Sequence, residues 1–496
     1  IELEEIGALI NNFLHDDNRV IVITGPEKEG LAQVTEEEVK TLLDTMKTAE
    51  INPYQDEAVR SDLIEKMPAP GSIVKSETNP NLDFTTFTLS NGAKVTYKKT
   101  DFKNDEVLFE AYSPGGTSLY SDEEYLATAF ANGGLSEAGI GGLSLTDMGK
   151  FMSGKIASVR PQISSIGEGF NGSAAPKDLE TLFQMVHLYF TSLNKDNEAF
   201  NSYISKQKSF LGNLMANPQF YFQDQIGKIR NEGNPRYTGF PTAEKMDAAD
   251  YDLAYEKYQE RFADAGDFHF FFVGNVDEDK LKTFAKTYIA SLPGLNSNET
   301  FVPTKFRRKD SYQKHVINRG SDPKSNVSFT WEEEIPYDSD TEMAVKALGE
   351  VLTIKLVEKL REEEGGVYGV GARGSLSKIS FSNLTFNIGF PCGPENVDKL
   401  IAATLEEIEK IKKEGVTDKD MAKVKETYLV KHKEDLKTNR FWLRSLLKAE
   451  RESGDLANNM KLEAKLDKLT SKDLQEVAQT YLDENYFLGI LMPEGD

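Results

Sequence analysis

Histidine and carboxylate side chains at metal-binding spacing would give this chain its most direct route to catalysis. A zinc hydrolase usually holds its metal with two imidazoles one helical turn apart, beside a glutamate that handles the proton. No two histidines of this chain lie within one turn of each other. The five are His15, His187, His269, His315 and His432. His269 stands between apolar residues, which predicts a histidine satisfied inside a sheet, and His432 stands between lysines, which predicts a solvated helix face. The sequence therefore assigns no metal ligand to this chain.

Other catalytic motifs are also missing from the sequence. The glycine-rich stretches do not continue into the Gly-Lys-Ser/Thr of a phosphate-binding loop, and tight turns or close backbone contacts explain them. No Gly-x-Ser-x-Gly sequence nominates a serine nucleophile. The single cysteine, Cys392, excludes an internal disulfide and a thiolate metal cluster. We therefore expect no cofactor to be bound by this chain alone.

An arginine and a tyrosine near the end of a long helix are the remaining candidates for chemistry. Apolar residues from Ala344 to Leu360 follow a helical period, and Gly365-Gly366 stops the helix before a strand at 367–375. Arg361 then lies in the last turn and Tyr368 two residues into the strand, so both could point past the same sheet end. Alternatively, Arg361 only complements the helix C-terminus and Tyr368 only packs on the sheet.

One layout of elements occurs three times along the chain. It consists of an amphipathic helix, a few polar residues, a short apolar strand and a Gly or Pro turn. The strands are read at 20–23, 268–273 and 486–492, roughly 220–250 residues apart, which indicates duplicated domains rather than a short repeat. In the first two copies a second helix follows the strand, and Thr35 with Glu38 predicts a capping box for the first of these.

These copies predict the domain organisation and the fold class. Because the chain opens with Ile1 inside a helical pattern, we expect residues 1–50 to be the tail of a preceding homologous domain whose body is absent. The other predicted segments are an extended linker at 51–81, a complete domain at 82–297 and a second complete domain at 298–496 that carries Arg361 and Tyr368. Asn91-Gly92 predicts a type I′ hairpin. We expect an α+β fold of two homologous domains, each a mostly antiparallel sheet with helices packed on one face.

Composition and charge limit the class of partner. Hydrophobic residues make up 39% and charged residues 28% of the chain, the balance of a soluble globular protein. The net charge of −23 argues against nucleic acid, whose phosphates would be repelled. No stretch approaches the roughly 20 apolar residues that a membrane span needs. We expect no nucleic acid partner and no membrane span.

The order and spacing of several short motifs carry a family resemblance. They are Leu89-Ser90-Asn91-Gly92, Ser113-Pro114-Gly115-Gly116, and the pair Arg361 and Tyr368 seven residues apart after a long helix. With two successive domains of about 200 residues, the chain resembles the non-metal-binding half of the insulinase/pitrilysin family of zinc peptidases. It is most similar to the bacterial members, in which a linker joins a catalytic half to a companion half.

The resemblance implies how chemistry would be shared. The family carries its H-x-x-E-H zinc motif on the first helix of its first domain, whereas the matching region 119–137 here has Ala127, Phe130 and Ala131 and no histidine. Zinc, the attacking water and the general base would therefore come from an N-terminal catalytic half of the same polypeptide. Arg361 and Tyr368 would bind the substrate, a peptide or an unfolded protein, and the oxyanion across the interface between halves. The fragment alone would be inactive.

Two further expectations follow from the resemblance. The compartment would be the bacterial periplasm or another extracytoplasmic space. The alternative function is a non-catalytic scaffold, because some members of the superfamily are structural core subunits.

Overall fold

The computed structural model describes residues 2–495, apart from 14–18, 26–29, 31, 33, 51–59, 61, 212–213, 296, 309–310, 453 and 455. It divides the chain into two compact units, residues 1–58 and residues 59–496. Within the described part of the chain, no helix is long and apolar enough to cross a membrane.

The first unit contains two helices, α1 (Leu3–Phe13) and α2 (Glu36–Thr48). The predicted capping box begins α2: Thr35 N donates to Glu38 Oε2 at 2.7 Å, and Glu38 N donates to Thr35 Oγ1 at 3.3 Å. The strand predicted at 20–23 is wrong for this structure, because these residues form no strand and are exposed. A strand needs a neighbour to pair with, and no strand occurs among the described residues of this unit. His15 lies outside the described residues.

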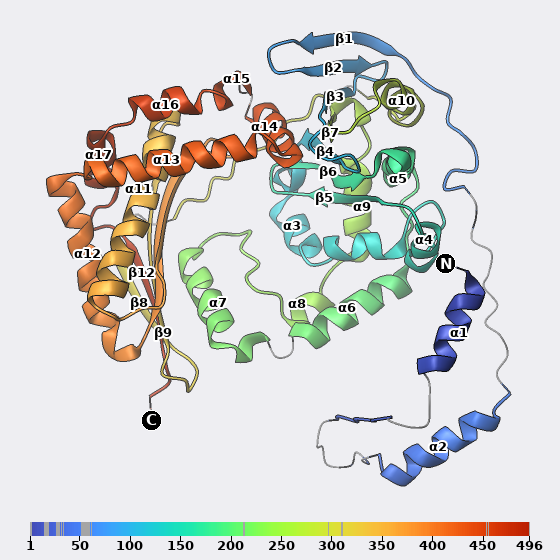
Figure 1. The fold of residues 1–496 in the computed structure, drawn as a ribbon, viewed down its shortest axis with the longest axis horizontal. Helices are drawn as coiled ribbons and strands as arrows, with labels where there is room; N and C mark the ends of the chain where they lie inside the picture. The colour runs from blue at the N-terminus through green and yellow to red at the C-terminus, as the bar shows by residue number, and fades with distance from the viewer. Residues whose placement is uncertain are drawn as a thin grey trace. The chain divides into compact units, whose positions relative to one another are not determined.

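The first sheet has seven strands in the order β1-β2-β3-β7-β4-β6-β5 (Figure 1). Its strands are β1 (Ile73–Asn79), β2 (Phe84–Leu89), β3 (Lys94–Lys99), β4 (Val107–Pro114), β5 (Ala157–Ile163), β6 (Gly167–Ala174) and β7 (His269–Gly274). The last strand in sequence, β7, is an inner strand that pairs parallel with β3 and antiparallel with β4. Strand β1 falls inside the segment expected to be a linker at 51–81. It is a mostly exposed edge strand, so it lacked the apolar alternation that reveals a buried one.

Two glycine positions show what the glycine-rich stretches do. In the hairpin between β2 and β3, only Gly92 has a positive φ, of 95°, so the predicted type I′ turn, which needs two such residues, is wrong. The Asn91 side chain instead donates to the carbonyl oxygens of Ile289 and Leu292 at 2.9 and 3.1 Å. In β6, a Cβ on Gly169 would lie 1.9 Å from the carbonyl oxygen of Ala111 in β4, so close strand contact requires this glycine.

Helices of the first domain cover one face of this sheet and extend beyond it. They are η1 (Gly116–Leu119), α3 (Asp122–Thr128), η2 (Asn132–Ala138), α4 (Leu145–Phe151), η3 (Pro176–Asp178), α5 (Leu179–Thr191), α6 (Asn197–Leu211), η4 (Leu214–Ala216), α7 (Pro218–Arg230), α8 (Ala243–Asp247), α9 (Tyr251–Arg261), η5 (Ala265–Asp267), α10 (Glu278–Phe284) and η6 (Ala285–Ile289). The core beneath them is rich in stacked aromatic rings, such as Phe183 on Phe272 with ring centres 4.9 Å apart.

The second sheet has five strands in the order β10-β11-β9-β12-β8. Its strands are β8 (Gln313–Asn318), β9 (Ser325–Glu334), β10 (Gly371–Ser377), β11 (Asn383–Cys392) and β12 (Phe487–Met492). The last strand again lies inside the sheet, parallel to β8 and antiparallel to β9. The two sheets therefore share the placement of their final strand, and the predicted α+β class with mostly antiparallel sheets is confirmed.

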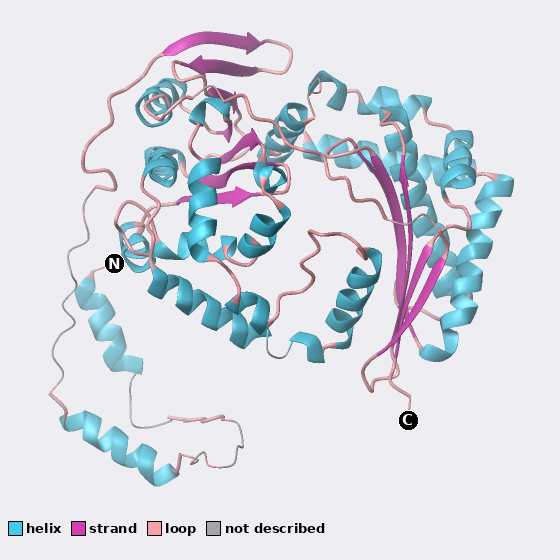
Figure 2. Ribbon diagram, turned by 180° about the vertical axis from the view of Figure 1, so that it is seen from behind, coloured by secondary structure: helices cyan, strands magenta, loops and turns pink. Residues whose placement is uncertain are grey.

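Helices pack on one face of the second sheet (Figure 2). The helices of this domain are α11 (Ser339–Leu356), η7 (Val357–Glu363), η8 (Pro394–Asn396), α12 (Val397–Glu414), α13 (Asp418–Asp435), α14 (Asn439–Arg451), α15 (Leu456–Asn459), α16 (Leu462–Lys468) and α17 (Ser471–Tyr481). Helix α11 contributes the apolar stripe expected from the sequence, and its residues from Ala344 to Leu356 on that stripe are buried.

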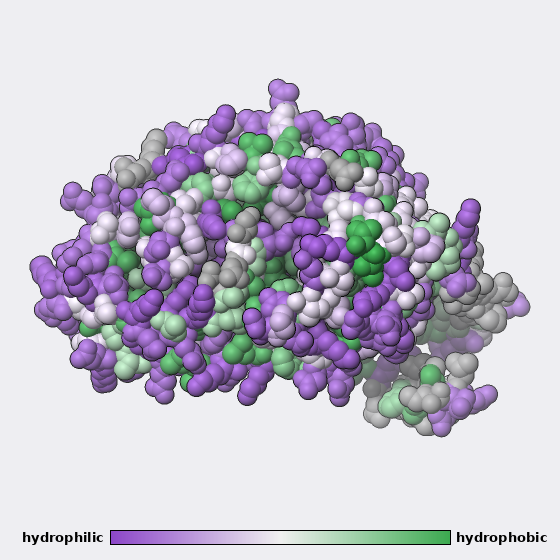
Figure 3. Space-filling view, turned by 90° about the horizontal axis from the view of Figure 1, so that it is seen from above, coloured by the Kyte–Doolittle hydropathy of each residue, from purple (hydrophilic) through white to green (hydrophobic). Residues whose placement is uncertain are grey.

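Each domain also lends a helix to the other domain's sheet. Helix α14 lies against β4 and β7 of the first sheet, where Leu443 and Leu446 are buried with Phe271 and Val273. Helix α7 lies against β8 and β12 of the second sheet, and Arg230 at its end contacts Glu332 at 2.6 Å. The first sheet is thus covered on both faces, with the second cover supplied by residues distant in sequence. The face of the molecule in Figure 3 is mostly hydrophilic, as the composition requires.

Candidate functional site

The helix that carries Arg361 changes its pitch near its C-terminal end. Asp338 begins α11 by accepting from the backbone N–H groups of Asp340 and Thr341 at 3.1 and 2.7 Å. After Leu356 the helix continues as the π-helical segment η7, in which Glu364 N donates to Lys359 O at 3.1 Å. Short π-helical segments inside helices are rare and are frequent at functional sites.

The helix ends after η7 at Gly365-Gly366, as the sequence predicts. Gly365 has a φ of 62°, which favours glycine, and Gly366 N donates to Leu360 O at 3.1 Å. Val367 re-enters the sheet through a single bridge to Cys392, but continuous pairing starts only at Gly371. The prediction that Tyr368 lies inside a strand is therefore wrong. On its β10 side, β11 pairs continuously only as far as Gly389, whereas on its β9 side the pairing continues through Pro391 and Cys392.

Two buried residues fix the ends of this turn, and the residue after each one is exposed. Leu360 is fully buried and Val367 is 8% exposed, whereas Arg361 is exposed and Tyr368 is 96% exposed. A tyrosine normally buries much of its ring, so this exposure contradicts the alternative that Tyr368 packs on the sheet. Neither side chain has a hydrogen bond or ion pair to any residue that the structure describes.

Lysines neutralise carboxylates around Arg361. Lys359 lies 3.3 Å from Glu363, and Lys399 lies 2.7 Å from Glu364, where its hydrogen bond lowers the pKa of that carboxyl. One turn earlier, Lys355 pairs with Glu358 at 3.1 Å. Within the described residues these acids already have cations, so they do not bind the Arg361 guanidinium. Its five donors stay available to an external acceptor.

The described histidines do not fit a zinc ion. Among the residues the structure places, no three His, Cys, Asp or Glu side chains converge as a metal would require. His187 Nδ1 contacts Tyr288 O at 2.8 Å, and the pKa of this buried imidazole is lowered by desolvation. His269 Nε2 lies 2.7 Å from Thr96 Oγ1, the satisfied sheet position expected from the sequence.

The sequence prediction that His432 lies on a solvated helix face is wrong. It is buried on α13 and lies edge-on to the ring of Phe441 in α14, at 5.6 Å between ring centres, instead of facing solvent. Its lysine neighbours remain exposed. Tertiary packing between the two helices, which local sequence does not reveal, decides this burial.

The region 119–137, expected to match the family's zinc helix, packs into the hydrophobic core of the first domain. It folds as the short α3 followed by η2, and Ala131 between them is fully buried while Phe130 packs against the same core. Ser121 begins α3 with a capping box. These positions supply packing and offer no ligand.

A buried polar cluster beside this region escaped the sequence reasoning. Glu168 in β6 is 2% exposed and accepts a hydrogen bond from Gly116 N at 2.7 Å, while Arg261 pairs with Glu299 at 2.7 Å. Desolvation raises the pKa of Glu168 to about 7. A lone glutamate among the glycines and apolar residues of β6 was the only signal in the sequence.

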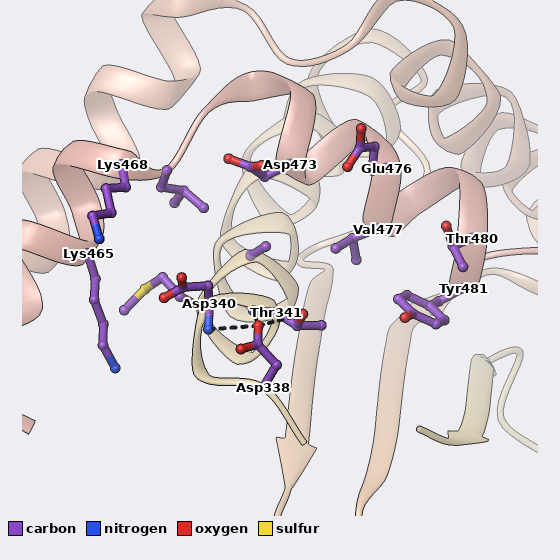
Figure 4. Close-up of a pocket in the computed structure, with 13 residues that line it drawn as sticks. Asp338, Asp340, Thr341, Lys465, Lys468, Asp473, Glu476, Val477, Thr480 and Tyr481 are labelled. Atoms are coloured by element: carbon purple, nitrogen blue, oxygen red, sulfur yellow. Dashed lines mark hydrogen bonds between the residues drawn. The ribbon is translucent and has the colours of Figure 1, made fainter. Parts of the chain in front are cut away.

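A hollow beside α11 lies at the start of the helix and not at the candidate pair. A cavity of about 330 Å³ lies between the start of α11 and the helices α16 and α17 (Figure 4). Its acids Asp338 and Asp473 already cap α11 and α17. Twenty helical residues separate Thr341 from Arg361, about 30 Å at 1.5 Å per residue. We therefore place the candidate site at the C-terminal end of the helix.

Two tandem sheet domains, with an exposed Arg361 and Tyr368 after the long helix of the second, are the arrangement that the resemblance to the non-metal-binding half of an insulinase/pitrilysin-type peptidase predicts. Comparison with known proteins agrees: residues 252–428 match the family model described as the peptidase M16 inactive domain. The family resemblance of the sequence is thereby confirmed. The matched residues include Arg361 and Tyr368.

Curated relatives extend the likeness over most of the chain. A probable zinc protease PqqL of Haemophilus influenzae is 24% identical over 430 residues, covering 84% of this chain and 44% of the relative. A zinc protease PQQL-like protein of Arabidopsis thaliana is 25% identical and covers 90% of this chain and 47% of the relative. The chain spans about half the length of the curated relatives it matches.

Solved structures confirm the fold. The periplasmic protease PqqL from Escherichia coli superposes with a TM-score of 0.76 at 21% identity, covering 93% of this chain and 51% of that one. A peptidase M16 inactive domain from Pseudomonas fluorescens superposes with a TM-score of 0.69 at 14% identity, covering 84% of this chain and 98% of that one.

Proposed function

We propose that this chain is the companion half of a zinc metalloendopeptidase and that Arg361 and Tyr368 bind the peptide substrate opposite the metal. The observation that carries the proposal is the exposure of both side chains, without a described partner, inside the segment that matches the M16 inactive domain. The family model, the curated zinc proteases and the fold support the class.

The chemistry suits these two side chains. A guanidinium and a phenol hydroxyl donate hydrogen bonds to a peptide carbonyl oxygen, and more strongly to the oxyanion that forms when water attacks it. The buried Leu360 and Val367 hold both ends of the turn, so the two donors are carried on a fixed backbone. Zinc, the attacking water and the general base are assigned to an N-terminal half of the same polypeptide, and this chain is proposed to be inactive alone.

The experiment uses the protein as its complete gene encodes it. Arg361→Ala and Tyr368→Phe are each expected to lower kcat by about 100-fold, the usual cost of removing an oxyanion donor, with zinc content unchanged. Tyr312→Phe and Arg319→Ala serve as matched controls, because Tyr312 is also exposed and Arg319 already pairs with Glu494 at 3.4 Å. Wild-type turnover in both site variants would remove the assignment.

A different observation distinguishes the alternative function, a non-catalytic scaffold, from the peptidase function. Reading the coding sequence upstream of Ile1 should reveal H-x-x-E-H on a helix of a homologous domain. If that motif is absent and the gene product cleaves no peptide, the chain belongs to a non-catalytic core subunit.

The proposed compartment is the periplasm or another extracytoplasmic space. It rests on the Escherichia coli protein of similar fold, which is described as periplasmic. Fractionation of the native host would test it, with recovery in the cytoplasmic fraction as the contrary result.

A further inference from the structure

The second sheet has a face that its own helices leave uncovered. Helices α11 and α12 lie on one side of this sheet (Figure 1), where alternate residues of its strands form a hydrophobic core. The residues in between project from the other face. Helix α7 contacts β8 and β12, whereas Arg373 of β10 and Asn387 of β11 are exposed on the uncovered face.

A row of small residues crosses this uncovered face. Gly371 of β10 lies opposite Gly389 of β11. Gly389 in turn lies opposite Ser328 of β9, which lies opposite Gly489 of β12. Residues that are directly opposite project from the same face, and Ile388, next to Gly389, is buried in the core on the helix side. Together the three glycines and the serine form the glycine row.

Packing within the chain does not require glycine at two positions of this row. A Cβ on Gly371 would meet no described atom within 4 Å, and a Cβ on Gly389 would meet only Val327 O, at 3.6 Å, an ordinary contact. By contrast, a Cβ on Gly374, which faces the helices, would lie 2.3 Å from Val345 O. Glycine weakens a strand, and it often marks a place where a ligand or another backbone approaches closely. Gly371 and Gly389 therefore fit contact with a chain from outside.

Two hydrogen-bond donors lie beside the glycine row. Arg373 lies opposite Asn387, two positions along each strand from the row. Thr330 of β9, on the other side of Asn387, donates to its Oδ1 at 2.9 Å. Because the amide group is planar, this bond turns Nδ2 of Asn387 away from β9 and toward the strand that carries Arg373. Among the residues that the structure describes, neither the Arg373 guanidinium nor this Nδ2 has an acceptor.

The carboxylates further along β9 already have cations. Glu332, two residues beyond Thr330, pairs with Arg230 at 2.6 Å and also with Arg308. Glu334 pairs with Arg307 at 2.5 Å. An arginine and an amide N–H side by side suit a carboxylate, whose oxygens only accept hydrogen bonds. The missing acceptor therefore fits a carboxylate that comes from outside the chain.

We propose that an extended segment of the peptide substrate lies along the glycine row and that Arg373 and Asn387 hold a carboxylate of that peptide. The proposal rests on the proposed function and adds a substrate class, peptides with an acidic residue or a free C-terminus at this place. The row begins three residues after Tyr368 (371 − 368), so the two sites are continuous along the chain. A Cβ on Gly489 would lie 3.2 Å from a ring carbon of α7, so this helix closes the far end of the row.

Binding of labelled peptides to this 496-residue chain tests the proposal without any cleavage. Three peptides share one sequence: the first has a central aspartate and an amidated end, the second a central asparagine and an amidated end, and the third a central asparagine and a free C-terminal carboxylate. At least one carboxylate peptide should bind about tenfold more tightly than the neutral second peptide, the effect of one charge-assisted hydrogen bond. Which of the two is preferred distinguishes a side-chain carboxylate from a terminal one.

Arg373→Gln should remove this preference, so that all three peptides bind within about twofold of one another. Arg160→Gln is the matched control and should keep the preference. Arg160 is likewise an exposed strand arginine opposite an asparagine, Asn171, but Nδ2 of Asn171 already donates to Gln162 Oε1 at 3.3 Å. Equal binding of all three peptides to the wild type would overturn the proposal, and so would a preference that survives in Arg373→Gln.

Gly389→Val tests the glycine row itself. Its Tm should stay within about 3 °C of the wild type, because the added side chain points away from the core and its Cβ meets only Val327 O. The affinity for the preferred peptide should fall by about tenfold, since the new side chain occupies the path of the peptide. Unchanged affinity in this folded variant would contradict the placement of the peptide along the row.

Cleavage by the product of the complete gene separates this proposal from the proposed function. Arg373→Gln should lower the ratio of kcat/KM between the preferred and the neutral peptide, whereas Arg361→Ala and Tyr368→Phe should lower kcat for both peptides. An unchanged ratio in Arg373→Gln would overturn the carboxylate subsite and leave the proposed function standing. Wild-type turnover in the other two variants would remove the proposed function, while the binding measurement still decides the subsite.

Discussion

Glu450, in the last turn of α14, lies 3.0 Å from Nδ1 of His269 in the inner strand β7. This contact lowers the pKa of the Glu450 carboxyl. The two residues are 181 positions apart (450 − 269) and belong to different predicted domains. A helix of the second domain therefore packs against the first sheet.

We predict that Leu446→Ala destabilises the protein by about 2–4 kcal/mol, because Leu446 is buried between α14 and the first sheet and its loss leaves a cavity. Denaturant unfolding would measure the change. Leu126→Ala is the control, since Leu126 is largely exposed on α3. Equal effects of the two variants would contradict the packing of α14.

The buried Glu168 should make stability depend on pH. Its folded pKa of about 7 lies above the ordinary value of 4.5, so between these values the folded state holds a proton that the unfolded state releases. This contribution is fully present below pH 4.5 and is lost as pH rises toward 7. It amounts to about 3 kcal/mol.

Glu168→Gln isolates that contribution, because the amide does not titrate and its oxygen can still accept from Gly116 N. The unfolding free energy of the wild type, measured relative to that of the variant at the same pH, should fall as pH rises from 4.5 to 7. A pH-independent difference would show that Glu168 is ionised throughout.

Arg361→Ala and Tyr368→Ala should each change the free energy of unfolding by less than about 0.5 kcal/mol, because neither side chain is buried or paired within the described structure. Leu360→Ala, next to Arg361 but fully buried, should cost about 2–5 kcal/mol. A large loss for Tyr368→Ala would instead favour a structural role.

Zinc supplied to the purified 496-residue chain should remain substoichiometric after dialysis, because the described His, Cys, Asp and Glu side chains do not converge on one point. Elemental analysis would measure it, with the whole gene product as the positive comparison. One tightly held zinc per chain would contradict the division of chemistry between halves.

Features that depend only on residues close together in the sequence could be predicted from it. The helical period from Ala344 to Leu360 and the stop at Gly365 were readable because amphipathic spacing and a positive φ are local requirements. The choice of Arg361 and Tyr368 came from their spacing after that helix and from family resemblance. Their exposure could not be read from the sequence, because it depends on where the pairing between β10 and β11 begins.

The sequence by itself determined the α+β class, the helix–strand unit that closes each of the two sheets and the lack of paired histidines, since each follows from residue type and period. Tertiary structure alone decided that His432 is buried, that α14 covers the first sheet and that residues 20–23 stay unpaired. These outcomes depend on contacts between segments far apart in the chain. A strand is stable only beside a neighbour, and its own residues cannot say whether one is present.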